Sequence, residues 1–434
     1  MEYKESGISW VGKIPKNWAI IKIKHKFSVK ARVGWKGLKS DEFLSDGYAY
    51  LVTGSDFEDG KVKWSKCYHI DKDRYEDDPF IQLKEADLLI TKDGTIGKLA
   101  VVSGMDKPAC LNSGIFVVRS TEMDLGTKFL FWILRSSIFM QFNEYTSYGS
   151  TIQHLYQNVF VEFSFPFPSE QEQSRIILYL EHKVAEIRSL IEDKKKLIHL
   201  YSEEKIALIK AFVSKGLDEK VKLKPSGNEW LGEIPSHWNT VSLKWVSKIY
   251  SGGTPSRNEP DYWKNGNIPW LNSGTVNQFM ITTASEYITE KAFKSSSAKW
   301  ITENSLVIAL AGQGKTKGMV AQVMMKCTCN QSLGVIVPSA EMDSKYLLYY
   351  LHSNYQNIRN LGGGDLRDGI NLEMVGSIKV PLFSLVEQKQ IADRIVQEST
   401  IIDLKMKKTT TLIAYLEEYQ TALISEVVLG KKRL

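Results

Sequence analysis

The chain has 434 residues, of which 43% are hydrophobic and 24% are charged, and its formal net charge is +6. This length predicts two to four domains, and the composition is ordinary for a soluble globular protein. The mild positive charge favours a polyanionic partner but does not establish one, because many proteins this basic bind no nucleic acid. No run of 18 apolar residues occurs and the N-terminal sequence is polar, which excludes a membrane-spanning helix and predicts no signal peptide.

The cysteines give no sign of a metal site. Cys67, Cys110, Cys327 and Cys329 lack the spacing of zinc ligands, so we expect reduced thiols. Together with the absence of membrane or secretion signals, this predicts a cytoplasmic protein with no membrane partner.

The first part of the chain, residues 1–168, is predicted to be a mixed α/β domain with a mostly β core. Short apolar runs separated by glycine-rich or polar turns predict strands at 48–52, 87–91, 99–103, 115–118 and 160–165. One helix is expected at about 127–141.

A long helix is predicted next, over residues 169–216. Ser169 and Glu172 form a capping box, and Gly216 supplies the stop. Alternating steps of three and four from Ile177 to Phe212 meet mostly apolar or aromatic residues, interrupted by Lys194 and Lys205, which is typical of a coiled-coil seam. The helix would extend about 70 Å, more than one small domain covers, and so requires a partner helix.

The partner is predicted at the other end of the chain, over residues 384–434. Ser384 and Glu387 repeat the capping box, and Gly430 repeats the stop. We therefore expect the two long helices to pair as an antiparallel coiled coil.

The similarity between the two helices continues into the segments before them. The motif Trp-x-Gly-x-Ile-Pro-x-x-Trp at 10–18 recurs at 230–238, and the apolar run at 87–90 recurs at 305–308. The chain is therefore an internal repeat in which each half is a globular domain followed by a long helix. The second domain is placed at 217–383, with a charged linker at 217–228 and a helix at about 343–358. The fold class is α+β with pseudo-twofold symmetry.

Two similar but non-identical domains joined by a helical spacer resemble a dimeric DNA reader, in which two heads read two half-sites at a fixed separation. Because the heads differ in sequence, the two half-sites are expected to differ too.

Several motifs together resemble the specificity subunit of type I restriction–modification enzymes. They are the repeated Trp-x-Gly-x-Ile-Pro-x-x-Trp motif, the Ser-Gly-Gly-Thr-Pro-Ser stretch at 251–256 with Ile268-Pro-Trp270, and the Glu-Gln-x-x-Ile helix start. The resemblance spans both halves and both helices. The first half departs from it, because 30–36 reads Lys-Ala-Arg-Val-Gly-Trp-Lys where the second half has Gly-Gly-Thr-Pro.

This resemblance implies a non-catalytic subunit of a bacterial defence system with two target-recognition domains, each reading half of a split, asymmetric site in double-stranded DNA. It further implies that the helices dock two DNA methyltransferase subunits, with restriction and motor subunits completing the assembly. No cofactor is expected on this chain; S-adenosylmethionine, ATP and magnesium are expected on the partner subunits.

One segment imitates a nucleotide-binding loop. Residues 309–316 satisfy the pattern [AG]-x4-G-K-[ST], but the next residues form a β-rich run rather than a helix start, and the repeat counterpart lacks Gly-Lys-Thr. No methyltransferase motif occurs. The carboxylates Glu85 and Asp87 near Lys92 have no matching set in the second half, so we interpret them as solvated loop residues rather than as a nuclease site.

Basic, hydroxyl and amide residues in the domain loops are the candidate DNA contacts, because such side chains pair with phosphates and base edges. For any one of them the alternative is an ordinary solvated surface residue. In the first half the candidates are Arg32, Lys36, Lys61, Lys63, Lys92, Lys98, Gln153 and His154. In the second half they are Ser251, Thr254, Ser256, Arg257, Lys264, Gln313, Lys315, Lys317 and Arg367. The tryptophans of the repeated motif are expected instead to pack each domain against the helices.

Two alternatives stay open from the sequence. The first is the specificity subunit of a related system in which one partner chain carries both methyltransferase and nuclease. The second is a two-headed coiled-coil scaffold that binds only proteins, which would show no salt-dependent affinity for DNA.

Overall fold

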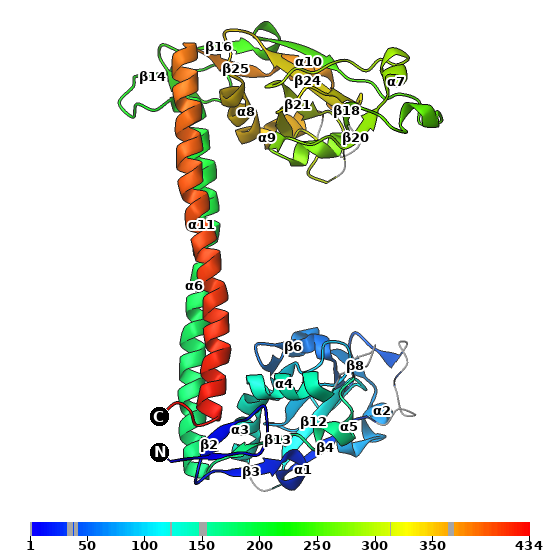
Figure 1. Ribbon diagram of the computed structural model, residues 1–434, viewed down its shortest axis with the longest axis vertical. Coiled ribbons are helices and arrows are strands. Elements are labelled where there is room, and N and C mark those ends of the chain that lie inside the picture. The colour runs from blue at the N-terminus through cyan, green and yellow to red at the C-terminus, as the bar shows by residue number, and fades with distance from the viewer. Residues whose placement is uncertain are drawn as a thin grey trace. The chain divides into compact units, whose positions relative to one another are not determined.

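The computed structural model describes residues 2–32, 38, 42–121, 124–146, 154–312, 314–362 and 369–434. It divides into two compact units, one formed by residues 1–195 with 410–434 and the other by residues 196–409. Each unit contains one globular domain and one half of each of two long helices, α6 (Glu170–Lys215) and α11 (Leu385–Val428) (Figure 1).

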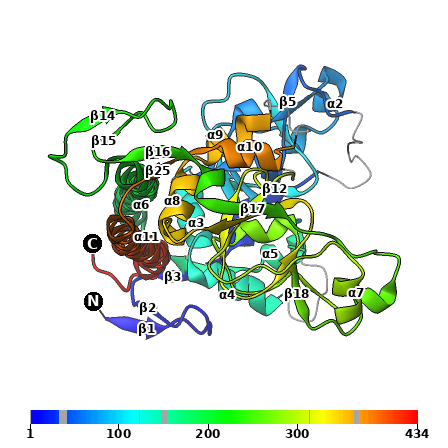
Figure 2. The same cartoon turned by 90° about the horizontal axis from the view of Figure 1, so that it is seen from above.

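The two long helices lie side by side and run antiparallel (Figures 1 and 2). In the first unit, Leu180 and Val184 of α6 share a buried cluster with Leu423 and Val427 of α11. In the second unit, the seam carries an ion pair, in which Lys205 Nζ lies 2.7 Å from both carboxylate oxygens of Asp403. The predicted antiparallel coiled coil is confirmed.

The first capping box forms as the sequence predicts, with the Ser169 backbone N–H donating to Glu172 Oε2 at 3.3 Å. The second forms only in part, because the Glu387 carboxylate binds His237 and Trp238 instead. The Glu172 backbone N–H donates to Ser169 Oγ at 3.4 Å, and the Ser169 hydroxyl donates to the Glu172 carboxylate at 2.8 Å. At the start of α11, the Glu387 backbone N–H donates to Ser384 Oγ at 3.2 Å. Both helices are thus fixed at their first turns, where backbone donors have no partner within the helix.

The first domain is built around a six-stranded sheet. Its strands, in spatial order, are β4 (Phe27–Lys30), β12 (Ile115–Ser120), β9 (Leu88–Thr91), β10 (Leu99–Val101), β7 (Lys61–Val62) and β6 (Phe57–Glu58). A three-stranded sheet contains β11 (Ala109–Leu111), β5 (Ala49–Val52) and β8 (Tyr68–Ile70). Two strand pairs complete it: β1 (Tyr3–Glu5) with β2 (Lys13–Pro15), and β3 (Ala19–Lys22) with β13 (Ser164–Phe167). The helices are α1 (Ile23–Lys26), α2 (Lys72–Glu76), α3 (Asp124–Leu134), α4 (Ser137–Thr146) and α5 (Gln157–Phe160).

The second domain has a five-stranded sheet in the corresponding order. Its strands are β17 (Ser247–Ser251), β24 (Leu333–Pro338), β21 (Leu306–Ala309), β22 (Val320–Val323) and β19 (Met280–Ile281). The three-stranded sheet contains β20 (Glu286–Ile288), β18 (Ile268–Leu271) and β23 (Thr328–Cys329). The strand pairs are β14 (Leu223–Pro225) with β15 (Glu233–Pro235), and β16 (Asn239–Ser242) with β25 (Lys379–Leu382). The helices are α7 (Glu290–Lys294), α8 (Ser344–Ser353), α9 (Tyr355–Arg359) and α10 (Leu372–Ser377).

The pairing directions repeat as well as the strand order. In both domains the central hairpin, β9–β10 or β21–β22, is antiparallel, and its second strand pairs in parallel with β7 or β19. The smaller sheet likewise has one parallel pair, β11 with β5 or β23 with β18. The internal repeat predicted from the sequence is therefore a repeat of topology.

Several local predictions need correction. The run at 160–165 is not one strand, because it begins in α5 and ends in β13. Each helix predicted after the sheet is two helices, since Ser136 Oγ donates to the Ile133 carbonyl and Asn354 Nδ2 to the Tyr350 carbonyl, where the chain turns. The segment 217–228 is more than a linker, because it contains β14.

The second tryptophan of each repeated motif joins its domain to a long helix, as expected, whereas Trp10 contacts the rings of Phe142 and Tyr145 on α4. Trp18 Nε1 donates to Glu172 Oε1 at 3.1 Å, and Trp238 Nε1 donates to Glu387 Oε1 at 3.0 Å. Gly430 packs against Trp18 with a φ of +66°. A Cβ there would approach Trp18 to 2.9 Å, so the end of α11 fits only as glycine. Trp18 and Trp238 thus each hold the start of one long helix.

Asp87 is not the solvated loop residue predicted from the sequence. Its carboxylate is 5% exposed and accepts two hydrogen bonds from the Arg119 guanidinium, at 2.7 and 2.6 Å. The expectation failed because the partner lies 32 residues further along the chain. Glu85 is exposed, and it accepts a hydrogen bond from the Met105 backbone N–H.

Candidate nucleic-acid interface

One residue in each domain ties three loop segments together through its backbone. The Lys92 N–H donates to the Gly114 carbonyl at 2.9 Å, and the Lys92 carbonyl accepts from the Leu155 N–H at 2.9 Å. Leu310, in the corresponding place after β21, makes the same two bonds, donating to Ser332 at 2.9 Å and accepting from Ile370 at 2.7 Å. We call this arrangement the loop framework. It fixes the loop after the central strand next to two other loops without using a side chain.

The side chains on the framework of the first domain include three predicted candidates. Lys92 lies 3.4 Å from the Asp93 carboxylate, and the His154 Nδ1 makes a close contact with the same carboxylate. Lys98 is exposed at the far end of the loop, where its backbone N–H donates to Thr91 Oγ1. Lys92, Lys98 and His154 are therefore brought together on one loop and its neighbour.

The framework of the second domain carries different side chains. Lys315 is exposed, and its carbonyl accepts a hydrogen bond from the Tyr355 hydroxyl at 2.7 Å, so α9 supports the loop from behind. The Thr254 hydroxyl makes a close hydrogen bond to Gln331 Oε1, which connects the loop after β17 to the loop before β24. Thr254 and Lys315 thus lie on neighbouring loops, and Gln331 is a polar contact that the sequence analysis did not single out.

Three other candidates in the second domain, Ser256, Arg257 and Lys264, lie at or beside the ring of Trp263. The Arg257 guanidinium stacks 3.7 Å from the Trp263 ring centroid and binds the Glu286 carboxylate through two bonds, at 2.5 and 2.9 Å. The Ser256 carbonyl accepts from Trp263 Nε1 at 3.0 Å. Lys264 is the next residue and is exposed. Because Glu286 already holds Arg257, DNA would have to compete with that carboxylate for the guanidinium.

Two candidates are not on the surface. Arg32 is buried, with its Nε donating to the Leu111 carbonyl at 3.0 Å, and Lys317 is buried as well. Neither charged group is accessible to DNA at the surface, so we remove both residues from the candidate set. Their burial was not visible in the sequence, because basic residues in glycine-containing loops are usually solvated.

The remaining candidates lie at the edges or outside the described residues. Lys61 and Lys63 are exposed on and beside β7, next to the edge strand β6, and Lys63 pairs with Glu58 at 3.6 Å. Ser251 is half-buried at the end of β17. The candidates Lys36, Gln153, Gln313 and Arg367 lie outside the described residues.

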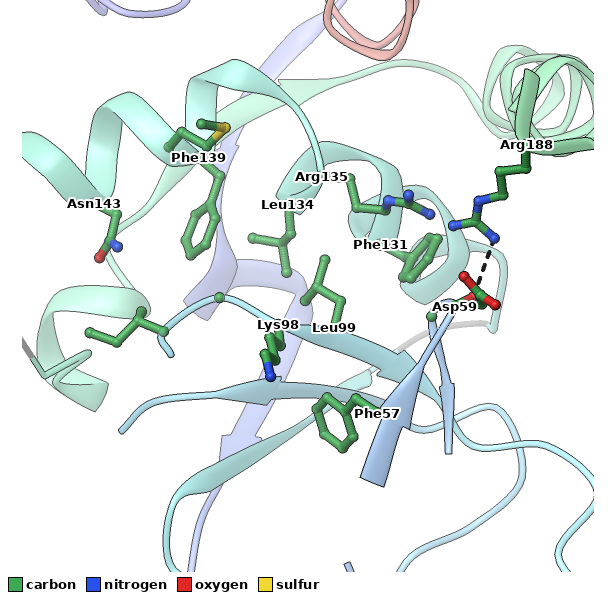
Figure 3. A pocket seen from close by; sticks show the side chains of 14 residues that line it. Phe57, Asp59, Lys98, Leu99, Phe131, Leu134, Arg135, Phe139, Asn143 and Arg188 are labelled. Atoms are coloured by element: carbon green, nitrogen blue, oxygen red, sulfur yellow. Dashed lines mark hydrogen bonds between the residues drawn. The ribbon is translucent and has the colours of Figure 1, made fainter. Parts of the chain in front are cut away.

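The sequence analysis missed a pair of arginines in the first unit. Arg135, at the end of α3, and Arg188, on α6, point toward one another in a cavity of about 420 Å³ whose wall includes Lys98 (Figure 3). Burial, with a smaller contribution from repulsion by Arg188, lowers the pKa of the Arg135 guanidinium to about 10. No short motif marks this pair, because its members are 53 residues apart in the chain.

The segment that imitates a nucleotide-binding loop does not open a helix. It joins β21 to β22, which are antiparallel neighbours, so it leads into a strand and not into the helix that a nucleotide-binding loop opens. All four cysteines are buried free thiols. Within the described ranges, no cluster of three or more His, Cys, Asp or Glu side chains could hold a metal ion, and none of the helices there is long and apolar enough to cross a membrane.

Comparison with known proteins agrees with this architecture. The putative type I restriction enzyme MjaX specificity subunit of Methanocaldococcus jannaschii is 25% identical over 448 aligned positions, covering 100% of this chain and 98% of that protein. The EcoR124I/EcoR124II specificity subunit of Escherichia coli is 30% identical over 166 residues, which is 37% of this chain and 40% of that protein. A solved chain from a type I R-M system has the same fold, with a TM-score of 0.70 at 16% identity, and the match covers 96% of this chain and 98% of the other.

The two halves also match one family domain each. Residues 15–199 and 235–413 match the type I restriction modification DNA specificity domain. These two ranges contain both loop frameworks and most of both long helices. Proteins of this family are the non-catalytic recognition subunits of restriction–modification complexes. The chain belongs to the type I restriction–modification DNA specificity family.

Proposed function

We propose that the two domains read the two halves of a split, asymmetric DNA site, each through its own loop framework. The observation that carries the proposal is the pair of identical backbone hydrogen bonds at Lys92 and Leu310, around which the side chains differ. A shared framework with different loop sequences is what two readers of different half-sites require. Direct readout depends on side-chain donors and acceptors rather than on the backbone that positions them.

The polar residues on the two frameworks suit different base edges and phosphates. Lys92, Lys98 and His154 give the first domain three nitrogen groups, two of which, Lys92 and His154, already contact Asp93. The second domain presents Lys315 and the amide of Gln331 instead. Lysine suits guanine or phosphate and glutamine suits adenine, so the two frameworks are expected to prefer different bases.

The long helices are proposed to dock two DNA methyltransferase subunits, with restriction and motor subunits joining the assembly. One face of α11 supports this, because its apolar side chains recur at helical spacing yet are 41–63% exposed. They are Ile401, Leu404, Leu412, Tyr415 and Tyr419. Under this proposal the partner subunits bind S-adenosylmethionine, ATP and magnesium.

The experiment that tests the split site is genome-wide mapping of methylated bases in a host strain with and without this gene. We expect deletion to remove methylation at one split motif whose two halves differ. Loss of methylation at a continuous motif, or at a motif with identical halves, would contradict the proposal. A strain that carries the gene and its partner genes on a plasmid is the matched control.

Lys315 tests the framework directly. In a complex purified with its partner subunits, Lys315→Ala is expected to weaken binding to the target duplex by about tenfold, because a charge-assisted contact is lost. Lys299→Ala, which removes an exposed lysine of the same domain, is the control. Fluorescence anisotropy measures both, and equal affinities for the two variants would count against the role of this loop.

A further inference from the structure

The cavity between α3 and α6 in the first unit has apolar walls and a cationic end. Its walls include Phe57, Leu99, Phe131, Leu134 and Phe139, and its charged lining residues are Asp59, Lys98, Arg135 and Arg188 (Figure 3). The volume of about 420 Å³ lies within the usual range for small-molecule sites. A mostly apolar lining with a few convergent polar groups is also typical of such sites.

The two arginines keep most of their donors unused. Arg135 lies over the rings of Phe131 and Trp132, at 5.2 and 5.3 Å, and its guanidinium has no hydrogen bond or ion pair within the described part of the chain. Arg188 donates one long bond of 3.4 Å to the Asp59 carbonyl oxygen. The Asp59 carboxylate lies near enough to oppose the lowering of the Arg135 pKa, but Arg188 is the stronger influence. Two like charges facing one cavity are stabilised by an anion between them.

The corresponding place in the second unit is filled. Gly60 and Phe279 are equivalent by sheet register, because the Val101 N–H donates to the Gly60 carbonyl and the Gln322 N–H to the Phe279 carbonyl. The Phe279 ring packs 5.5 Å from Tyr349 and 5.1 Å from His352. A side chain at Gly60 is disfavoured by its φ of +78° and by Phe131, which a Cβ would approach to 3.0 Å.

The charged residues at this place also differ between the two units. Aligning the two capping boxes places Asp403 at the position of Arg188, and the helix repeat places His352 at the position of Arg135. Asp403 is paired with Lys205, whereas the arginines face the cavity. At this place the first unit therefore has a cavity lined by two arginines. The second unit has a packed phenylalanine ring and an aspartate paired with a lysine.

We propose that the cavity of Arg135 and Arg188 binds a phosphate group. Guanidinium groups bind phosphate oxygens through paired, planar hydrogen bonds, which suits two arginines that converge on one space. Lys98 lies on the wall of the cavity and on the loop of the first framework, so a phosphate of DNA bound by that framework is one source. A phosphate ester of a free nucleotide, with its base against the phenylalanines, is the other. The DNA source rests on the proposed reading of DNA by the first domain, whereas the nucleotide source does not.

A purely structural role for Arg135 makes a different prediction. A cation after the last residue of α3 interacts favourably with the helix dipole, and its contacts with Phe131 and Trp132 add packing. In that case substitution lowers stability but leaves ligand binding unchanged. Arg188 makes neither of these contacts, so a variant of Arg188 alone separates the two roles.

The test uses the full chain in complex with its partner subunits, as wild type, as Arg188→Gln and as Arg135→Gln with Arg188→Gln. Lys210→Gln, an exposed lysine elsewhere on α6, is the control for loss of charge. Anisotropy titrations with a target and a non-target duplex over a range of salt concentrations give the affinity and its salt dependence. Thermal melts with inorganic phosphate and with adenosine monophosphate test free ligands.

If DNA supplies the phosphate, the double variant binds both duplexes about tenfold more weakly and its salt slope is shallower by about one, while Lys210→Gln is unchanged. If a nucleotide supplies it, adenosine monophosphate raises the melting midpoint of the wild type but not of Arg188→Gln. The proposal is overturned if neither difference occurs, or if the variants lose only a partner subunit. If the phosphate proposal is overturned but Lys315→Ala still weakens DNA binding, the proposed function is unaffected.

Discussion

The two domains share a strand order and a loop framework but stabilise the central sheet differently. In the first domain the buried Asp87 pairs with Arg119, whereas the register of β9 and β21 places Ser305 and Val337 at the same positions in the second. Ser305 Oγ lies 3.0 Å from Thr302 Oγ1, and Val337 packs against a hydrophobic cluster. The backbone is thus preserved while the side chains that support it have diverged, which is the freedom that two readers of different half-sites need.

The largest expected loss of stability comes from substituting the two tryptophans that hold the long helices. Trp238 stacks on Phe383 with ring centroids 3.8 Å apart, whereas the capping-box alignment puts Pro168 beside Trp18. Trp238→Ala is expected to lower the free energy of unfolding of the second unit by about 4 kcal/mol. Trp18→Ala should cost about 1 kcal/mol less in the first unit, because Pro168 has no aromatic ring to stack on Trp18. Chemical denaturation followed by circular dichroism measures both, and a larger loss for Trp18→Ala would contradict this comparison.

A second prediction concerns replacing the Asp87–Arg119 pair of the first domain by the residue types at the same positions in the second domain. Arg119→Val leaves the buried Asp87 carboxylate unpaired, so we expect a loss of about 3 kcal/mol in the stability of the first unit. The double variant Asp87→Ser with Arg119→Val reproduces the second domain and should recover most of that loss. Urea titrations of the wild type, both single variants and the double variant give the coupling. Additive losses would show that the two solutions are not interchangeable.

A smaller effect is expected from pH. Burial lowers the pKa of His352 below its usual 6.5, and Lys205 lowers it further, so the folded second unit disfavours the proton. As the pH falls through 6.5 the unfolded chain binds that proton first. The stability that the buried neutral His352 contributes is therefore complete above pH 6.5 and is lost as the pH falls toward its pKa in the folded state. Melting midpoints between pH 7.5 and pH 5.5 (about one pKa unit either side of 6.5) should decline less in His352→Gln than in the wild type. Parallel declines would contradict the assignment.

The sequence predicted what depends on periodicity and repetition. The seam from Ile177, the first capping box and the helix contacts of Trp18 and Trp238 all follow from spacing along the chain, and the structure confirms each of them. Strands with a continuous apolar run, such as β9 and β21, were predicted for the same reason.

The features that the sequence did not predict depend on contacts between distant residues. Asp87 was expected in solvent because nothing near it in the chain identifies Arg119 as its partner. Arg32 was expected at the surface, but its guanidinium donates to the Leu111 carbonyl inside the domain. The cavity of Arg135 and Arg188 could be recognised only after the sheet register had made Gly60 and Phe279 equivalent.

Under the proposed function, each domain reads its own half-site independently of the other domain. The most direct measurement is methylated-base mapping in cells whose specificity subunit has residues 230–383 replaced by residues 10–168, together with the native partner subunits. Because the long helices are antiparallel, two copies of the first domain should direct methylation to a symmetric motif in which the first half-site occurs twice, inverted. Continued methylation of the original asymmetric motif would contradict the account.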